Sequence, residues 1–169
     1  MRLPERITEW LLGRIPNRPP DFIIGGEDNP YLYRWYVIPR NRWLNIYVHK
    51  FLRSDDDRAL HDHPWASVSV VLQGYMGEAY YRDVTDRVTG TPRHRIIDTG
   101  EVIYRRASFA HRLIVPTIEY LPNPITLFVT GPKTREWGFW CPQGWRHWRE
   151  FCAVDEHNKN SGRVGKGCE

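Results

Sequence analysis

The stretch LHDHPWASVSVVLQG, residues 60–74, contains two histidines one residue apart, His61 and His63, and ends at Gly74. Side chains alternate between the two faces of a strand, so both imidazoles point the same way if this stretch is extended. A second strand-like stretch, GEVIYRRASFAH, covers residues 100–111 and ends on His111. A third imidazole from a neighbouring strand would complete a metal site with open positions for a substrate.

The first stretch resembles the first signature motif of the cupin superfamily. In that motif, two histidines around one residue are followed by a carboxylate and then by a glycine. His61, His63 and Gly74 match this pattern, and Ser67 stands at the carboxylate position.

The second stretch resembles the second cupin motif, in which a glycine precedes a proline–x–glycine turn and a histidine. Gly100 and His111 match, whereas the turn is Arg106-Ala107-Ser108. The resemblance spans roughly residues 43–130. It implies an all-β, cupin-type double-stranded β-helix (a jelly-roll barrel) in which His61, His63 and His111 are metal ligands.

Among cupins, the chain is most similar to the thiol dioxygenases, which hold iron with three histidines and no carboxylate. Three neutral imidazoles leave a divalent metal its full charge, which favours anionic ligands such as thiolates and carboxylates. The resemblance implies Fe(II) and an arginine on an early strand that holds a substrate carboxylate. Arg34 in YLYRW is the nearest match. The three histidines alone do not select iron over zinc, nickel or manganese.

The rest of the chain predicts one helix followed by many strands. An amphipathic helix is predicted over residues 3–13, and the prolines of GRIPNRPP (13–20) predict an extended linker. Strands separated by short turns are predicted at 31–38, 43–50, 66–73, 75–84, 93–99, 101–106, 111–117 and 124–130. We therefore expect an N-terminal helix and linker (1–20), one barrel domain (21–152) and a mobile tail (153–169).

The composition indicates one globular domain. The chain has 169 residues, of which 41% are hydrophobic, and this is enough for one core. No apolar run is long enough to span a membrane, and the start MRLPERITEW lacks the apolar core of a signal peptide, so a cytoplasmic location is predicted. The net charge of +4 is spread along the chain and indicates a solvated basic surface rather than a nucleic-acid site. The three cysteines, Cys141, Cys152 and Cys168, have no CxxC spacing, so neither a zinc knuckle nor a disulfide framework is expected.

Other polar residues near the motifs are candidates for a catalytic role. Glu78 could enter the metal's coordination shell, orient a ligand imidazole through its second N–H, or lie on the surface. Tyr80, Tyr81 and Tyr104 are candidate phenol donors toward oxygen or substrate, although most tyrosines in a barrel pack in its core or at its rim. His49 is a fourth ligand or a proton relay if its face lines the cavity, and we favour a role other than ligand.

Several charged residues have both a structural and a functional interpretation. Asp62 is expected to point away from its two neighbouring histidines and to bond the backbone or Arg58. Ion pairs with the turn SDDD (54–57) are the expected role of Arg53 and Arg58. The arginines that could instead clamp an anionic substrate are Arg53, Arg58, Arg105 and Arg106.

The segment REWGFWCPQGWRHWREF (135–151) is a tryptophan-rich C-terminal extension that contains Cys141. It is either a lid that closes the barrel and excludes water, or a packing strip within the chain or against a second subunit. Packing is the favoured interpretation, and the second half is a candidate short helix. A homodimer would fit the aromatic excess.

The favoured functional hypothesis is an Fe(II) dioxygenase acting on a small anionic molecule, either a thiol or a carboxylate. Its catalytic residues would be Arg34, Glu78, Tyr80 and Tyr104, around a metal held by His61, His63 and His111. One alternative is a non-oxidative isomerase or lyase that uses zinc, nickel or manganese as a Lewis acid. Another is a binding module without catalysis.

Overall fold

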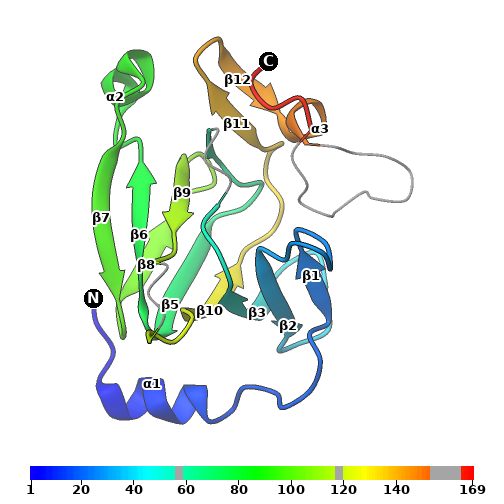
Figure 1. Cartoon of the computed structure of the whole chain (residues 1–169), viewed down its shortest axis with the longest axis vertical. Helices are drawn as coiled ribbons and strands as arrows, with labels where there is room; N and C mark the ends of the chain where they lie inside the picture. Colours follow the sequence, from blue (N-terminus) through cyan, green and yellow to red (C-terminus); the bar gives the residue numbers. More distant parts are fainter. Residues whose placement is uncertain (56–58, 117–119, 153–164) are drawn as a thin grey trace.

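The computed structural model describes residues 1–55, 59–116, 120–152 and 165–169, and this part of the chain is mostly antiparallel β-structure (Figure 1). Two six-stranded sheets face each other. The first sheet has the order β1-β2-β3-β10-β5-β8, and the second has the order β12-β11-β4-β9-β6-β7. The strands of the first sheet are β1 (Phe22–Ile24), β2 (Leu32–Tyr36), β3 (Asn45–Phe51), β10 (Ile125–Thr130), β5 (Ser67–Gln73) and β8 (Val102–Arg105). Those of the second are β12 (Gly144–His147), β11 (Gly138–Cys141), β4 (Leu60–His61), β9 (His111–Ile114), β6 (Tyr75–Tyr80) and β7 (Arg93–Asp98). The predicted all-β jelly roll with a short N-terminal helix is confirmed.

The N-terminal helix α1 (Glu5–Leu12) lies along the lower end of the sheets in Figure 1. It starts after Pro4 and ends at Gly13, close to the predicted bounds. Strand β1 was not predicted, because three residues are too few to show an alternating pattern. It pairs with β2 at the edge of the first sheet.

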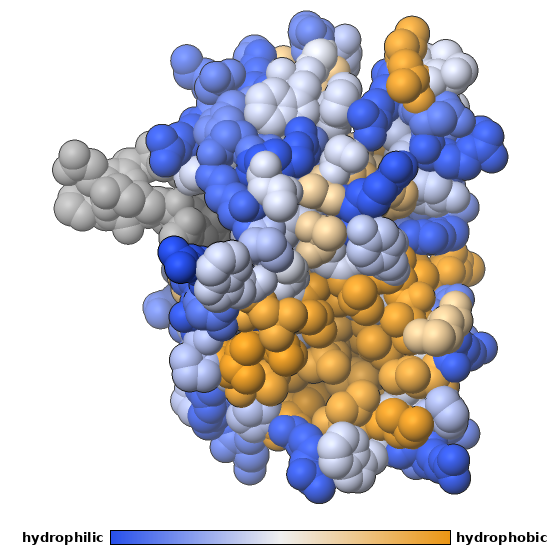
Figure 2. Space-filling model, turned by 180° about the vertical axis from the view of Figure 1, so that it is seen from behind, coloured by the Kyte–Doolittle hydropathy of each residue, from blue (hydrophilic) through white to orange (hydrophobic). Residues whose placement is uncertain are grey.

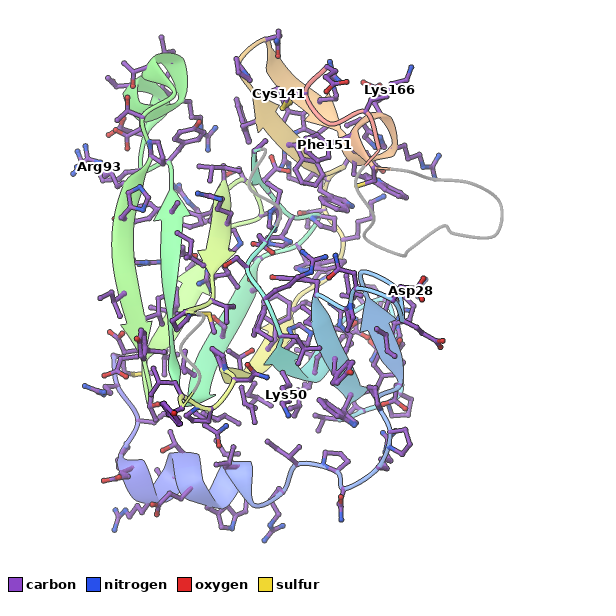
Figure 3. The ribbon with its side chains drawn as sticks, viewed as in Figure 1. Asp28, Lys50, Arg93, Cys141, Phe151 and Lys166 are labelled. Atoms are coloured by element: carbon purple, nitrogen blue, oxygen red, sulfur yellow. A yellow bond between two sulfur atoms is a disulfide. The ribbon has the colours of Figure 1, made fainter. Side chains whose placement is uncertain are left out.

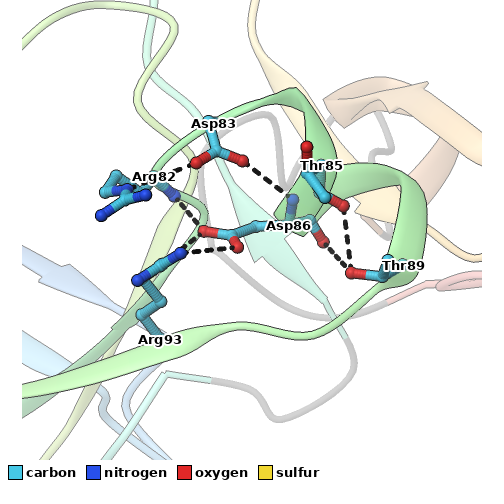
Figure 4. Close-up of polar contacts among 6 residues, drawn as sticks. All are labelled: Arg82, Asp83, Thr85, Asp86, Thr89 and Arg93. Carbon is cyan, nitrogen blue, oxygen red and sulfur yellow. Dashed lines mark hydrogen bonds and ion pairs between the residues drawn. The ribbon is translucent and has the colours of Figure 1, made fainter.

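The predicted strand over residues 75–84 is too long, because β6 ends at Tyr80 and a helix, α2 (Val84–Thr89), follows. Asp83 caps this helix: its carboxylate accepts a hydrogen bond from the Asp86 backbone N–H at 3.1 Å (Figure 4). The Asp86 carboxylate in turn accepts from the backbone N–H of Arg82 and from Arg93 Nε, each at 2.9 Å. These local polar contacts override the strand pattern.

The two glycines that frame the histidine motifs are required by the backbone. Gly74 joins β5 to β6 with a φ of +72°, and a Cβ there would lie 3.1 Å from the Pro122 carbonyl oxygen. Gly100 precedes β8 with a φ of +86°, and a Cβ there would lie 2.9 Å from the Leu3 carbonyl oxygen. Both positions therefore favour glycine for conformation and for space.

The two faces of the first sheet differ in character. The residues that point inward from β3, such as His49 and Phe51, line an internal cavity. The intervening residues point outward, and seen from behind this face is broadly apolar (Figure 2). The outward residues on the three central strands are Ile46, Val48, Val68, Val70, Leu127 and Val129, which are in register with one another. We call this set the outer apolar face.

The tryptophan-rich segment forms a hairpin of β11 and β12 followed by a short helix, α3 (Trp148–Phe151). The hairpin extends the second sheet beside β4, and Figure 3 shows Cys141 and Phe151 close together at this end of the molecule. The expectation of no disulfide is wrong, because Cys141 is bonded to Cys168. Sequence spacing could not reveal this pair, because the fold brings the two residues together from 27 positions apart.

The predicted mobile tail divides into two parts. Residues 153–164 lie outside the described residues. Residues 165–169 lie against the hairpin and α3, where Arg146 donates to the Gly167 carbonyl oxygen and the backbone N–H of Gly165 donates to the carbonyl oxygen of Phe151. None of the helices in the described ranges combines the length and the apolar character needed to cross a bilayer.

Candidate metal centre

Three histidine side chains converge between the two sheets. His61 in β4 and His111 in β9 lie directly opposite each other in an antiparallel pair. His63 follows β4, and its backbone N–H donates to the Ala107 carbonyl oxygen, which ties the first motif to the turn of the second. One nitrogen from each ring lies within 4.8 Å of the other two, so the three residues can share one ion.

The donor set fits a divalent transition metal. The Nε2 atoms of His63 and His111 are 2.9 Å apart. At a metal–nitrogen distance of about 2.05 Å, two ligands at right angles would also be roughly 2.9 Å apart. The same separation also suits a hydrogen bond between the two rings when one Nε2 carries a proton. Metal analysis distinguishes a metal-bound pair from a metal-free, hydrogen-bonded pair.

Glu78 is the group that orients His111. Its side chain is 0% exposed, and its Oε1 lies 2.6 Å from His111 Nδ1. With the Nδ1–H donated to Glu78, the Nε2 lone pair of His111 points to the metal position. Arg105 Nε donates to Oε1 at 2.7 Å and Arg95 Nε donates to Oε2 at 2.6 Å, so two cations hold the carboxylate. Glu78 is therefore buried behind His111 rather than on the surface.

The protonation states of this network suit metal binding. Burial lowers the pKa of His111 to about 4, although the Glu78 carboxylate opposes the shift. Burial also lowers the pKa of His63 well below its ordinary value, assisted by the positive charges around it. Burial raises the pKa of Glu78, but the hydrogen bond to His111 and the charges of Arg105 and Arg95 outweigh it, so that the pKa is lowered. At neutral pH both imidazoles are neutral, as ligands must be, and Glu78 is ionised.

Arg34 and His49 form a second polar pair on the inner face of the first sheet. They lie opposite each other in β2 and β3, and Arg34 Nε donates to His49 Nε2 at 2.8 Å. Burial, followed by the charge of Arg34, lowers the pKa of His49 well below its ordinary value, so His49 is neutral and can accept this bond. His49 does not belong to the group of possible metal ligands found among the described residues, in line with the role we favoured.

One cavity of about 690 Å³ contains both the three histidines and the Arg34–His49 pair. Its wall is largely apolar, with residues from both sheets. This size is typical of a site for a small organic molecule.

Solved structures share this arrangement of strands. HppE in its iron(II) form matches with a TM-score of 0.51 at 16% identity, over 69% of this chain and 58% of that protein. The chain has the cupin fold. The DMSP lyase DddQ from Ruegeria pomeroyi DSS-3 matches with a TM-score of 0.49 at 14% identity, over 70% of this chain and 57% of that one. A Klebsiella pneumoniae protein with a double-stranded β-helix domain matches with a TM-score of 0.44 at 17% identity, over 66% and 85% of the two chains.

The chain spans less than two thirds of the length of HppE and DddQ. No protein-family model matches the sequence, and neither does any curated protein. The similarity therefore establishes the cupin fold, and activity has to be argued from the site.

Aromatic residues of the C-terminal extension form one wall of the cupin cavity beside the histidines. Trp137 stacks on Trp148 with ring centres 5.7 Å apart, and Phe139 stacks on Phe151. The ring centre of Phe139 lies 5.7 Å from that of His61. The extension thus packs within the chain, which is the role we favoured, and its inner side lines the cavity. Its action as a lid stays a prediction.

Asp62 points away from its neighbouring histidines, as expected from strand alternation. Its carboxylate accepts from the Gly138 backbone N–H at 2.9 Å and from Trp145 Nε1 at 3.1 Å, and it pairs with Arg135 at 2.8 Å. The backbone bond agrees with the prediction, whereas the alternative partner, Arg58, lies outside the described residues. Asp62 therefore fixes the extension to the segment that carries His61 and His63.

None of the three candidate phenol donors, Tyr80, Tyr81 and Tyr104, belongs to the described lining of the cavity. Tyr104 is 65% exposed, because it is opposite Val68 on the outward side of β8. The cavity lining does not include it, so its role toward oxygen or substrate stays a prediction. Tyr80 is half-buried and stacks on Phe109 under the guanidinium of Arg95, and the described cavity lining does not include it.

The other candidate clamps are also occupied or remote. Arg105 lines the cavity, but Glu78 and Ser69 take its donors. Arg53 donates to carbonyl oxygens, including that of Asn29, and Arg106 is exposed. Arg58 lies outside the described residues.

No local pattern in the sequence predicts the role of Arg95, which shares Glu78 with Arg105. Its position on β7 opposite Glu78 became visible only with the strand register. Trp137 and Phe139 belong to the tryptophan-rich run, but the run alone does not predict their position beside His61. That position depends on the pairing of β11 with β4.

Proposed function

We propose that this protein is a metal-dependent cupin enzyme, specifically an Fe(II) dioxygenase that acts on a small anionic substrate, a thiol or a carboxylate. The observation that carries the proposal is the convergence of His61, His63 and His111 in a cavity that also contains Arg34. The ligand set has no carboxylate to reduce the metal's charge, which favours an anionic substrate. HppE, which shares the fold, is an iron(II) protein.

The metal would supply redox chemistry between the substrate and oxygen, and the chain's own residues would do the rest. Glu78 keeps the proton of His111 on Nδ1, which leaves Nε2 unprotonated for the metal. Arg34 would pair with the anionic group of the substrate, and the Trp137 and Phe139 side would exclude water from the reacting atoms. Tyr80 would have to act from outside the lining, so we give it no part in substrate contact.

The test begins with elemental analysis of protein purified without added metal. The protein is then loaded anaerobically with Fe(II), and oxygen uptake is measured with cysteine, 3-mercaptopropionate and carboxylates from acetate to octanoate. We expect uptake that depends on substrate and is lost in His61→Ala. An iron-loaded protein that consumes no oxygen with any of these compounds would contradict the dioxygenase. Turnover without oxygen would support the isomerase or lyase instead.

We also propose a homodimer formed through the outer apolar face. A twisted sheet with an apolar face packs on a second such sheet, and two copies of this chain would present the same face to each other. Sedimentation equilibrium should give a dimer for the unmodified chain and a monomer for Leu127→Asp. Ile96→Asp, at an exposed site on β7, is the control and should remain a dimer. A monomeric unmodified chain would overturn this proposal.

The cytoplasmic location stays a prediction, and the Cys141–Cys168 disulfide argues against it, because structural disulfides persist mainly in oxidising compartments. Mass analysis of alkylated protein taken directly from cells would show which redox state the pair has there.

A further inference from the structure

The cavity is much larger than the three-histidine centre needs. A space of about 150 Å³ is enough to hold benzene, and this cavity measures about 690 Å³. An amino acid or a small thiol would leave most of it unfilled. The chemistry of the remaining wall therefore indicates what else the ligand carries.

The part of the wall away from the histidines is hydrophobic core. A cluster of buried side chains, less than 5% exposed, lines the cavity: Leu32, Phe51, Val71, Met76 and Ile97. The partly buried Ile24, Tyr31 and Leu113 pack against this cluster and also line the cavity. We call these eight residues the apolar chamber. Such a surface binds apolar groups because contact with them removes both from water.

Arg34 lines the same cavity as this chamber and the three histidines. It follows Leu32 by two positions on the inner face of β2, so both side chains point into the same space.

The guanidinium of Arg34 has capacity for an anion. Its Nε donates to His49, and its plane lies 4.7 Å from the centre of the Tyr47 ring. Within the described ranges no carboxylate forms an ion pair with it, and burial is the main cause that lowers the pKa of this guanidinium. The cavity carboxylates are elsewhere: Asp55, for example, accepts from the Leu113 backbone N–H. A largely buried cation without a counterion is costly, and an anionic ligand would remove that cost.

We infer that the cavity takes an amphiphilic carboxylate, with its anionic group on Arg34 and an alkyl or aryl body of about eight or more carbons in the apolar chamber. A planar guanidinium with its terminal N–H groups available matches a carboxylate in a two-point contact. The inference rests on the proposed function in one respect, which is that this ligand is the enzyme's substrate.

Isothermal titration calorimetry with a matched ligand series tests the inference. The probes are octanoate, hexanoate, butanoate and acetate, with 1-octanol and octylamine as neutral and cationic controls. Each is measured on metal-loaded and on EDTA-treated protein. We expect each added methylene to tighten binding roughly threefold to fourfold, and octanoate to bind at least tenfold more tightly than 1-octanol or octylamine. This preference should persist without metal.

Arg34→Met should reduce the preference for octanoate over 1-octanol at least tenfold and leave 1-octanol binding unchanged. Arg42→Met is the matched control, because Arg42 lies over Trp43 and is not among the lining residues. Two results on the unmodified protein would each overturn the inference. One is acetate binding as tightly as octanoate, and the other is octylamine binding as tightly as octanoate. Loss of the preference on metal removal would also overturn it, because the metal and not Arg34 would then hold the carboxylate. None of these results depends on oxygen uptake, so failure of the dioxygenase and failure of the ligand class are distinguishable.

Discussion

Replacing Glu78 by glutamine tests the buried network behind His111 most directly. The carboxylate is 0% exposed and serves His111, Arg105 and Arg95 through two oxygens. Glutamine keeps the shape but has one oxygen and one NH₂ group, so at least one of these donors would face another donor. The substitution also leaves Arg105, which is 4% exposed, without its counterion.

The expected magnitude follows from that burial. Removing one partner of a buried ion pair typically costs about 3–5 kcal/mol of unfolding free energy. This is a large part of the total stability of about 5–15 kcal/mol that domains usually have. Loss of a residue that orients a ligand typically weakens metal binding about 10- to 100-fold. Both effects should therefore appear together in Glu78→Gln.

Urea unfolding of metal-free protein measures the first effect, and titration of the folded variant with Fe(II) or Zn(II) measures the second. Glu136→Gln is the matched control, because this glutamate pairs with Lys133 and His147 on the surface, where its side chain is 54% exposed. An exposed pair of this kind contributes less than about 1 kcal/mol. If Glu78→Gln unfolds at the same urea concentration as Glu136→Gln and binds metal as tightly as the unmodified chain, our account of the network is wrong.

Three further outcomes are expected. His61→Ala should reduce bound metal from one ion per chain to background in elemental analysis, whereas His94→Ala, at an exposed site on β7, should retain it. Asp62→Asn should lower the unfolding free energy by about 2 kcal/mol, because a buried acceptor of charge-assisted bonds is lost; equal urea midpoints for the variant and the unmodified chain would contradict this. The folded-state pKa of His111 is lowered from 6.5 to about 4, so its neutral form stabilises the metal-free fold above pH 6.5 and this contribution is lost as the pH falls toward 4. The shift corresponds to about 3 kcal/mol, and pH-dependent unfolding of metal-free His111→Gln should show a correspondingly smaller loss over that range.

The Glu78 network and the Arg34–His49 pair give the cavity two different electrostatic regions. At the metal centre the Glu78 carboxylate pairs with both Arg105 and Arg95. At Arg34 the cation has a neutral imidazole as its hydrogen-bond partner. Arg34 therefore brings a positive charge to the cavity, whose lining also includes Arg40 and Arg53. This arrangement would orient an anionic molecule before any reaction.

The sequence by itself determined the fold class and the three converging histidines. Alternation places His61 and His63 on one face, the strands have the spacing of a jelly roll, and the framing glycines occupy positions where their conformation is required. These features are local, so they can be read from neighbouring residues without knowledge of pairing.

Only the tertiary structure decided which of the remaining candidates reach the cavity. Tyr104 and Arg105 are adjacent in sequence, yet Tyr104 points to solvent and Arg105 to Glu78, because the phase of β8 is set by its pairing with β5. The same dependence on pairing placed Arg95 beside Glu78 and joined Cys141 to Cys168. Alternation gives the period of a strand, but which of its two faces is buried depends on the partner strand across the sheet, and that information is not local to the sequence.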